Sequence, residues 1–310
     1  MKNQAVAVGT SPGQRFLLAL VWPGVMAGSM AAFWWLTGPL QMSYEMALQA
    51  HFLVLFVGIF LLERLIPYHK SWNKYDRQGW NDFLYNITFP VAQIGATLVV
   101  LEVAAQDQSA NVDMFGMGLP VFAQFIALIL LVDLIWYVYH RSFHTFPVFW
   151  KFHALHHNSN QLHVLNNSRI HPVEVFVLFL IIMVMVEFVD VSPAVLSWYF
   201  AFQLTVGLLT HSNVAVHSGW LSWIFNTPEL HHWHHSRLRK EHDNNYGSVS
   251  MVWDHLFGTY FNPKGRQASE DIGADTPVPV GWFGQLLMPL RRSPESGITP
   301  PRAATSNSPD

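Results

Sequence analysis

The stretch PVEVFVLFLIIMVMVEFVDVSPAVLSWYFAFQLTVGLLT, residues 172–210, consists of two apolar runs joined by the short connection DVSP. Each run has roughly the length that an α-helix needs to cross about 30 Å of hydrocarbon. Because the connection is so short, we expect a tight helical hairpin that dips into a membrane and returns both outer ends to the same side. Glu187 and Asp190 near the turn leave a re-entrant or interfacial hairpin as the alternative, with the same consequence for its ends.

Four further apolar runs precede this hairpin, and each is roughly 20 residues long, which again fits a membrane span. They are Phe16–Leu36, Ala47–Ile66, Leu84–Ala104 and Leu119–Tyr139. The first run follows two basic residues, as a signal peptide does, but it lacks a clear small-residue cleavage site and is interpreted as a retained span. The sequence therefore predicts an all-α fold, a polytopic integral membrane helical bundle of four spans plus the hairpin, with a histidine-rich helical cap.

The 17 Lys and Arg residues are distributed unevenly around these runs. The connections 37–46, 105–118 and 190–192 contain none of them, whereas the termini and the remaining connections contain all but Arg64, which lies at the end of the second run. By the positive-inside rule, both termini and the histidine-bearing cap are expected on the cytoplasmic side, in a bacterial inner membrane or an endoplasmic reticulum. The chain has no cysteine, which excludes a disulfide framework, a thiolate zinc site or an iron–sulfur cluster built from this chain alone.

The chain divides by composition into four parts. We expect an N-terminal tail over residues 1–15, spans over 16–139, a histidine-motif region over 140–262 that includes the hairpin, and a C-terminal segment over 263–310. From about residue 293 the sequence is rich in Pro and Ser, which predicts disorder. The net charge of −3 gives no indication of nucleic-acid binding, so none is expected.

Three short clusters contain most of the histidines that could bind metal. HRSFH has histidines at i and i+4, and HALHH and HHWHH have them at i, i+3 and i+4, spacings that place imidazoles on one face of a helix. His232 in HHWHH points elsewhere in this arrangement. Eight imidazoles exceed the four-coordinate demand of one zinc ion and suit Zn, Cu, Fe or Ni, so we predict two metal ions. The eight are His140, His144, His153, His156, His157, His231, His234 and His235.

A carboxylate precedes the first cluster on the same helical stripe. In DLIWYVYHRSFH, Asp133 and Tyr137 lie on the face that carries His140 and His144. A carboxylate in the last turns of a membrane helix is costly to bury alone, so we expect Asp133 to accept from a ligand imidazole and fix its orientation. An unrelated polar contact within the bundle is the alternative.

Taken together, these motifs resemble those of a known superfamily. DLIWYVYHRSFH, FHALHHNSN, RIHPVE, HSNV, TPELHHWHHS, NNYGS and WDHLFGTY occur in the order and approximate spacing of the fatty acid hydroxylase or sterol desaturase superfamily, which residues 82–261 resemble. The resemblance implies a multi-span membrane enzyme with a cytoplasmic non-haem centre of two iron ions, for which zinc could substitute. Such enzymes use O2 and external electrons to hydroxylate, desaturate or oxidatively demethylate lipids.

The resemblance also implies roles for individual residues. The eight cluster histidines would be ligands, His211 and His171 are further candidates, and His217 competes with His211. Asn245 would orient a ligand or metal-bound water, and Asp254 would support the ligands from the turn that ends the core. We therefore expect hydroxylation of a C–H bond in a fatty acyl, sterol or ether lipid, with desaturation at the same site as the alternative, because no motif separates the two reactions.

The expected partners are a lipid from the bilayer, O2 and a separate electron donor. The chain has no flavin or dinucleotide fingerprint, so a ferredoxin, a cytochrome or a pterin would supply electrons. Two hypotheses that assign the chain to other classes of protein remain. A zinc-dependent membrane hydrolase could use Glu229 of PELHH as its base, and a metal transporter would hold its ligands near mid-membrane.

Overall fold

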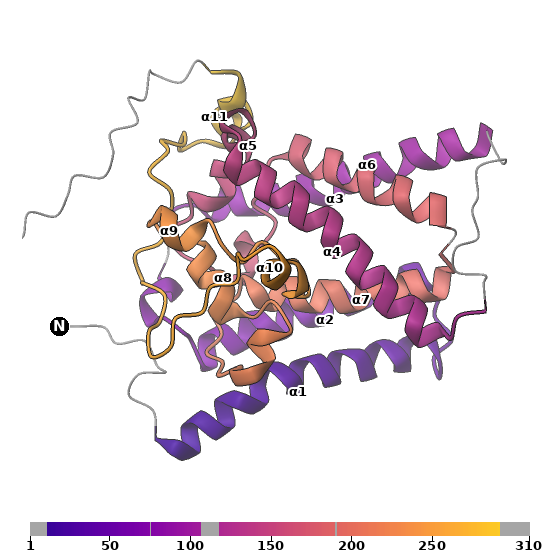
Figure 1. The fold of residues 1–310 in the computed structure, drawn as a ribbon, viewed down its shortest axis with the longest axis horizontal. Coiled ribbons are helices and arrows are strands. Elements are labelled where there is room, and N and C mark those ends of the chain that lie inside the picture. Colours follow the sequence, from indigo (N-terminus) through magenta and orange to yellow (C-terminus); the bar gives the residue numbers. More distant parts are fainter. Residues whose placement is uncertain (1–10, 75, 107–117, 190, 292–310) are drawn as a thin grey trace, which may run out of the picture.

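The computed structural model describes residues 11–74, 76–106, 118–189 and 191–291, and all regular elements in these residues are helical. Six long helices run alongside one another, and shorter helices gather at one end (Figure 1). The long helices are α1 (Pro12–Thr37), α2 (Tyr44–Leu65), α3 (Gly79–Gln106), α4 (Val121–Thr145), α6 (Pro172–Val189) and α7 (Pro193–Thr210). Each is long and apolar enough to cross a membrane, which confirms the all-α polytopic fold and makes this a multi-pass membrane protein.

A local sequence signal explains where α1 begins. The Ser11 hydroxyl accepts from the Gln14 backbone N–H, and the Gln14 side chain accepts from the Ser11 N–H, so a capping box starts α1 at Pro12. The expected tail over residues 1–15 is therefore too long at its C-terminal end, because α1 already includes residues 12–15. Residues 1–10 of that tail and the segment expected to be disordered from about residue 293 lie outside the described residues.

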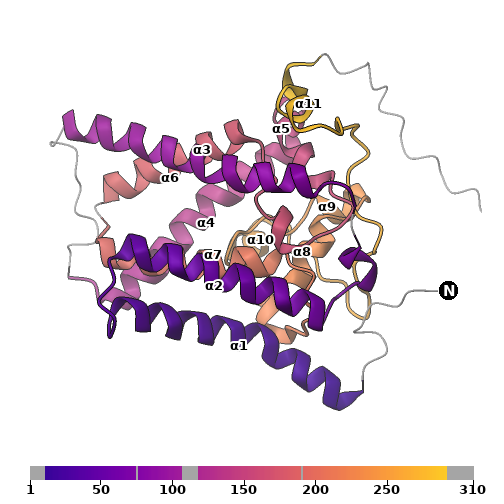
Figure 2. The same ribbon diagram turned by 180° about the vertical axis from the view of Figure 1, so that it is seen from behind.

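The two helices of the expected hairpin do not pack closely on each other. α6 packs mainly against α3, and α7 packs against α2 and α1, while α4 contacts both α6 and α7 (Figures 1 and 2). Leu128 and Val132 of α4 belong to the same buried cluster as Ile182 of α6 and Tyr199 of α7. The chain does reverse direction, as predicted, but the expectation of a tight hairpin is wrong because α4 fills the space between its arms.

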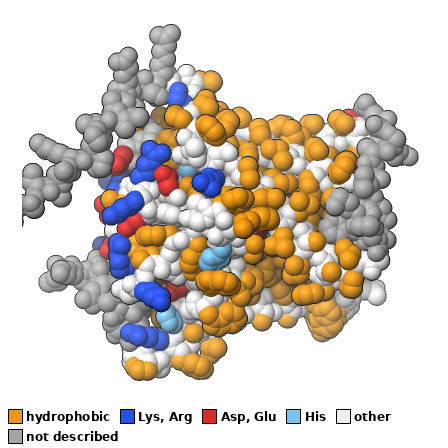
Figure 3. Space-filling model, in the orientation of Figure 1, with side chains coloured by type: hydrophobic (Ala, Val, Ile, Leu, Met, Phe, Trp, Pro, Cys, Tyr) orange, Lys and Arg blue, Asp and Glu red, His pale blue; other side chains and the backbone are white. Residues whose placement is uncertain are grey.

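The shorter helices and their loops form a cap at one end of the long helices. They are η2 (Lys70–Asn73), α5 (Pro147–His157), η3 (Val164–Asn166), η4 (Gly219–Trp223), α8 (Pro228–His234), α9 (Arg239–His242), α10 (Val252–Leu256), α11 (Trp282–Leu286) and η5 (Met288–Leu290). α1 starts and α2 and α7 end at the cap (Figure 1). Figure 3 shows charged side chains gathered on the cap and apolar side chains over the long helices. The surface therefore separates into a region suited to lipid and a region suited to water.

Candidate metal centre

Four helices bring nine histidines together where the long helices meet the cap. α4 carries His140 and His144 in its last turns, and Pro147 then starts α5 after α4 ends at Thr145, because proline fits the first turn of a helix. α5 carries His153, His156 and His157. α8 carries His231 and His234, and His235 and His211 cap the C-termini of α8 and α7. Eight of the nine are buried, and His211 is half-buried.

The nine histidines divide into two neighbouring sets, in each of which one ring nitrogen per residue lies within 4.8 Å of the others. The five-histidine set consists of His140, His144, His153, His157 and His234. The four-histidine set consists of His156, His211, His231 and His235. α5 and α8 each contribute to both sets, so the sets share their supporting helices.

Distances between Nε2 atoms in each set fit joint coordination of one ion. In the five-histidine set, His140 Nε2 lies 3.1 Å from His153 Nε2 and 3.0 Å from His234 Nε2. In the four-histidine set, His231 Nε2 lies 2.8 Å from His211 Nε2 and 3.0 Å from His235 Nε2. Two imidazole nitrogens that each bind a metal at about 2.0–2.1 Å are separated by roughly 3 Å. His144 Nε2 is buried without a hydrogen-bond partner, as a nitrogen meant for a metal would be in the metal-free protein.

The surroundings keep these rings neutral, which is the form that binds metal. Burial lowers the pKa of His153 to about 3 and the pKa of His211 to about 4. Burial, together with the neighbouring imidazoles, lowers the pKa values of the other cap ligands well below the ordinary value. Both sets therefore present nitrogen lone pairs at neutral pH.

Hydrogen bonds at Nδ1 fix the orientation of five rings. His140 Nδ1 donates to the Tyr246 carbonyl over 3.0 Å, and His234 Nδ1 donates to the Asn244 carbonyl over 2.7 Å. His211 Nδ1 donates to the Gly207 carbonyl over 3.2 Å. Because a carbonyl only accepts, the proton of each neutral ring must be on Nδ1, and Nε2 is left as the metal-facing lone pair.

Two carboxylates do the same for the remaining pair, and both were missed by the sequence analysis. Glu174 Oε1 lies 2.7 Å from His153 Nδ1, and Asp243 Oδ1 lies 3.3 Å from His144 Nδ1. Glu174 lies in the first turn of α6, and Asp243 caps the C-terminus of α9. RIHPVE does place Glu174 at the start of a span, where a carboxylate is unusual, and this was the one available signal.

The carboxylate expected to hold an imidazole has a different role. Asp133 accepts from the backbone N–H groups of Val249 and Ser250 over 3.1 and 2.6 Å, so the expectation of an imidazole partner is wrong. Its partners lie in the segment that follows Tyr246. Asp133 therefore ties α4 to the segment whose carbonyls orient His140 and His234.

Asn245, Asp254 and Tyr137 support the same segment. Asn245 has a φ of 57° and donates from Nδ2 to the carbonyls of Leu230 and Phe261, so its side chain contacts backbone and no ligand. Asp254 accepts from the N–H groups of Tyr246 and Gly247, both over 2.8 Å, and from the Thr259 hydroxyl. The Tyr137 hydroxyl lies 3.0 Å from Thr259 Oγ1. These side chains act on the ligands through the backbone of the segment.

The two other histidines weighed as ligands lie outside both sets. His171 Nε2 donates to the Leu286 carbonyl over 3.1 Å, while its Nδ1 accepts from the Val173 N–H. The His217 side chain is 49% exposed and lies 3.9 Å from Glu229. Of the uncertain candidates, the structure brings only His211 to the candidate metal centre.

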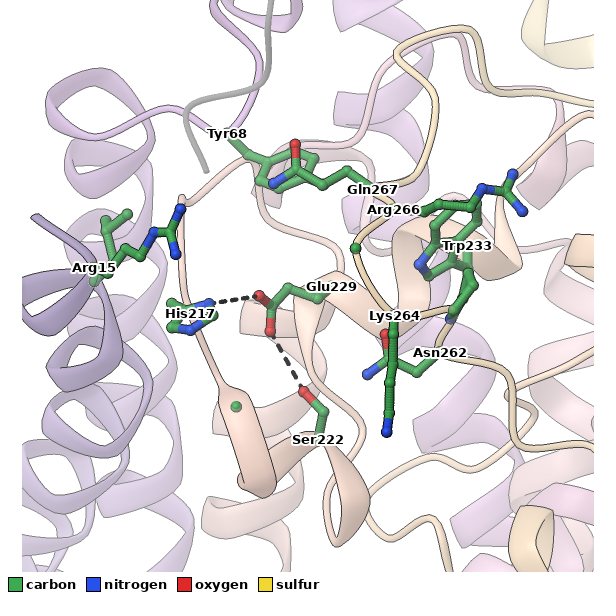
Figure 4. Close-up of a pocket in the computed structure, with 14 residues that line it drawn as sticks. Arg15, Tyr68, His217, Ser222, Glu229, Trp233, Asn262, Lys264, Arg266 and Gln267 are labelled. Carbon is green, nitrogen blue, oxygen red and sulfur yellow. Dashed lines mark hydrogen bonds and ion pairs between the residues drawn. The ribbon is translucent and has the colours of Figure 1, made fainter. Parts of the chain in front are cut away.

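Glu229 faces a separate cavity of about 400 Å³ (Figure 4). Its Oε2 accepts from the Ser218 N–H over 2.9 Å and from the Ser222 hydroxyl over 3.4 Å, and Oε1 lies towards His217. Glu229 belongs to neither histidine set. The placement expected of a general base beside the metal is therefore not found for this carboxylate.

An apolar groove of about 670 Å³ lies against α4, α5 and α6, next to the five-histidine set. Val138, Val177 and Ile181 line it and are between 39% and 54% exposed, so it opens on the surface that faces lipid. Glu174, which orients His153, lines it as well. The groove thus extends from the lipid-facing surface to a residue that contacts the candidate metal centre.

Comparison with known proteins places this constellation in a family. The fatty acid hydroxylase model matches residues 125–259, and the chain belongs to that family. Ornithine lipid hydroxylase OlsE of Rhizobium tropici is 32% identical over 282 residues, which cover 88% of this chain and 84% of that protein. Human alkylglycerol monooxygenase is 30% identical over 129 residues, 42% of this chain but only 28% of that protein. No solved structure matches.

Proposed function

We propose that this protein is a membrane-bound, O2-dependent lipid hydroxylase whose two histidine sets hold two iron ions. The observation that carries the proposal is the pair of adjacent Nε2 sets, of five and four histidines, beside an apolar groove on the lipid-facing surface. Relatives named for hydroxylation of an ornithine lipid and for monooxygenation of alkylglycerols support the same reaction class. A transporter would hold its ligands near the middle of the membrane. The two histidine sets lie instead where the spans meet the cap, which does not favour a transporter.

Two iron ions bound to these nitrogens would supply the reduction of O2 that inserts one oxygen atom into a C–H bond. The overall reaction converts R–H, O2, two electrons and two protons into R–OH and water. The protein holds neutral ring nitrogens at the required spacing and fixes five of the nine rings through their Nδ1 partners. Zinc could occupy the same nitrogens but supplies no electrons.

The apolar groove supports delivery of the substrate from the bilayer. A lipid chain can lie against Val138, Val177 and Ile181 without entering water, because these side chains already face lipid. An ornithine lipid is the first substrate to test, because the ornithine lipid hydroxylase covers most of this chain. Fatty acyl, sterol and ether lipids form the comparison set.

The electrons would come from a separate ferredoxin, cytochrome or pterin. We place the cap, both termini and the histidine sets on the cytoplasmic side, where such donors are found. The distribution of Lys and Arg supports this orientation, because the connections at the opposite end of the spans contain none.

Desaturation is the alternative outcome at the same site, and no described contact favours it. Purified, iron-loaded protein should be incubated with lipid, an electron donor and 18O2, and the lipids analysed by mass spectrometry. Hydroxylation adds one 18O atom to a lipid, whereas desaturation removes two hydrogen atoms and adds no label. Protein that holds about two iron ions, receives electrons and changes no lipid in the comparison set would overturn the proposal.

A further inference from the structure

Two short segments of the cap expose only apolar side chains. They are residues 219–226, which include η4, and residues 249–258, which include α10, and we call them together the apolar edge. Asp254 is the only Asp, Glu, Lys or Arg in either segment, and it is buried, as are the Ser and Asn side chains. A patch of this kind marks a contact with lipid or with another protein. Its exposed large side chains are Trp220, Trp223, Ile224, Val252, Leu256 and Phe257.

Hydrogen bonds join the two segments into one unit and satisfy their backbone. The Asn226 N–H donates to the Val249 carbonyl over 2.9 Å, and the Met251 N–H donates to the Ile224 carbonyl over 2.8 Å. His255 Nε2 donates to the last carbonyl of η4 over 2.8 Å. Irregular backbone is tolerated in a bilayer only when its polar groups are paired within the protein. The apolar edge meets this condition at these contacts.

Three of the spans contact the apolar edge well inside their length. The Phe225 ring centroid lies 5.1 Å from the Trp22 ring centroid of α1 and 6.1 Å from the Phe202 ring centroid of α7. Trp253 Nε1 donates to the Leu130 carbonyl of α4 over 3.0 Å. α10 accordingly lies against α4 part way along the long helices (Figure 1).

These contacts lie at the depth of the bilayer interior. At a rise of about 1.5 Å per residue, Trp22 lies about 15 Å from the start of α1, and Phe202 lies about 12 Å from the end of α7. The 18 residues of α7 extend over about 27 Å, close to the hydrocarbon thickness of about 30 Å. The apolar edge therefore reaches roughly halfway down the spans, although η4 and α10 are each only 5 residues long.

We infer that the apolar edge is inserted in the bilayer as a re-entrant part of the cap, with lipid hydrocarbon chains as its partner. At this depth its surroundings continue the lipid-facing surface of the spans, so Trp223 and Leu256, 63% and 67% exposed, have no water to face. A second copy of the chain is the less suitable partner, because helices pack together in membranes mainly through small residues, and these side chains are bulky.

Insertion connects the bilayer to the candidate metal centre. Residues 249 and 250 of the apolar edge also end the segment whose carbonyls orient His140 and His234. The lipid contact would therefore anchor the support of two candidate ligands. This role is independent of the reaction catalysed, so the inference goes beyond the proposed function and stands or fails separately from it.

The absence of cysteine allows a nitroxide label to be placed at single sites of the full-length protein in lipid nanodiscs. Ile224→Cys and Leu256→Cys place the label on the two segments. Val184→Cys, at a position 54% exposed on α6, is the lipid control, and Lys240→Cys, at an exposed position on α9, is the water control. Power-saturation EPR compares collisions of the label with O2, which concentrates in lipid, and with a water-soluble nickel complex.

Both test positions should lose the nickel accessibility of the Lys240 control and match the oxygen accessibility of the Val184 control. Nickel accessibility equal to that of the Lys240 control would show contact with water and overturn the inference. Low accessibility to both reagents, with dipolar broadening between labels, would assign the surface to a second copy and overturn it as well. Bound zinc verifies the fold of each variant, and a variant that loses zinc is replaced by a label at the exposed neighbour, Trp223 or Phe257.

Discussion

His232 and His235 lie within one turn of α8 but have different surroundings. His235 Nε2 is 3.0 Å from His231 Nε2 in the four-histidine set, whereas His232 Nε2 donates to the Ser212 carbonyl over 3.1 Å. The His232 ring packs against Tyr68 and Trp72, with ring centroids 4.6 and 5.2 Å away. The helical spacing separates a candidate ligand from a packed, hydrogen-bonded core residue.

This difference predicts opposite effects of two alanine substitutions. His235→Ala should reduce the bound metal, measured by elemental analysis, from about two ions to one or none. His232→Ala should keep the metal but lower the free energy of unfolding by about 1–3 kcal/mol, because the Ser212 carbonyl loses its partner. Equal loss of metal in the two variants would contradict the assignment of the two faces of α8.

Residue spacing could predict the eight cluster histidines, because the histidines of each cluster lie within about one helical turn of each other. It could not settle His211, His171 and His217, since their distances from the clusters depend on how α7, the loop after it and the C-terminal segment fold back. Glu174 and Asp243 were missed for the same reason. Each contacts a histidine on a different helix, and one sequence carries no direct signal of such a contact.

At the scale of elements, the segment from Asn244 to Ser250 connects the metal centre to α4 and α10. Its carbonyls orient His234 and His140, and its N–H groups donate to Asp254 and Asp133. Gly247 makes the tight turn possible. A β-carbon at this position would clash with the Ser250 carbonyl and lie 3.0 Å from Asp254 Oδ2.

Gly247→Ala should therefore displace the segment and rotate His140. We expect a loss of stability of about 1–3 kcal/mol, the usual cost of forced overpacking, together with weaker metal binding. Thermal unfolding with and without added metal measures both effects. Gly258→Ala serves as a control, because Gly258 has a φ of 72° but nothing within 4 Å of a β-carbon, so it tests backbone strain without the clash. Metal affinity equal to that of the control would contradict the proposed role of the segment.

The helices themselves were predictable from apolar run length, but their packing was not. Runs of 18 or more apolar residues identify spans because a bilayer has a fixed thickness. A short connection such as DVSP indicates that two helices are consecutive, and it carries no information about a third helix between them. α4 occupies that position because its apolar residues face both α6 and α7.

On the scale of the whole molecule, nine buried or half-buried imidazoles make the metal-free protein sensitive to acid. The folded-state pKa values of His211 and His153, about 4 and 3, lie below the ordinary 6.5. As the pH falls below about 6.5, these histidines take up protons in the unfolded chain but not in the folded chain, so the free energy of unfolding declines until the pH nears the folded-state pKa values. Each such histidine lowers the free energy of unfolding by about 1.4 kcal/mol per pH unit in this window.

Chelator-treated protein should thus unfold at a clearly lower temperature at pH 5.5 than at pH 7.5. Addition of zinc at pH 7.5 should raise the unfolding temperature, because the metal binds only the folded arrangement of nitrogens. Differential scanning fluorimetry on the same preparation compares all these conditions. Equal unfolding temperatures of the metal-free protein at the two pH values would show that the imidazoles are accessible to protons in the folded state.

The absence of cysteine makes the membrane orientation directly testable. Leu40 follows α1 at the end away from the cap and is 54% exposed, and Lys240 is exposed on α9 in the cap. A membrane-impermeant maleimide should label Leu40→Cys in intact cells and Lys240→Cys only after permeabilisation. The reverse pattern would place the histidine sets on the outer side.

α5 and α8 each hold ligands of both histidine sets, and this sharing determines how the protein takes up its two metal ions. An ion in one set fixes the two helices in the positions that the other set requires, so the second ion should bind more tightly than the first. Titration should then be sigmoidal, with little half-loaded protein at any point. In a cell short of iron, the population would divide into complete and empty molecules, and total activity would follow the number of complete ones.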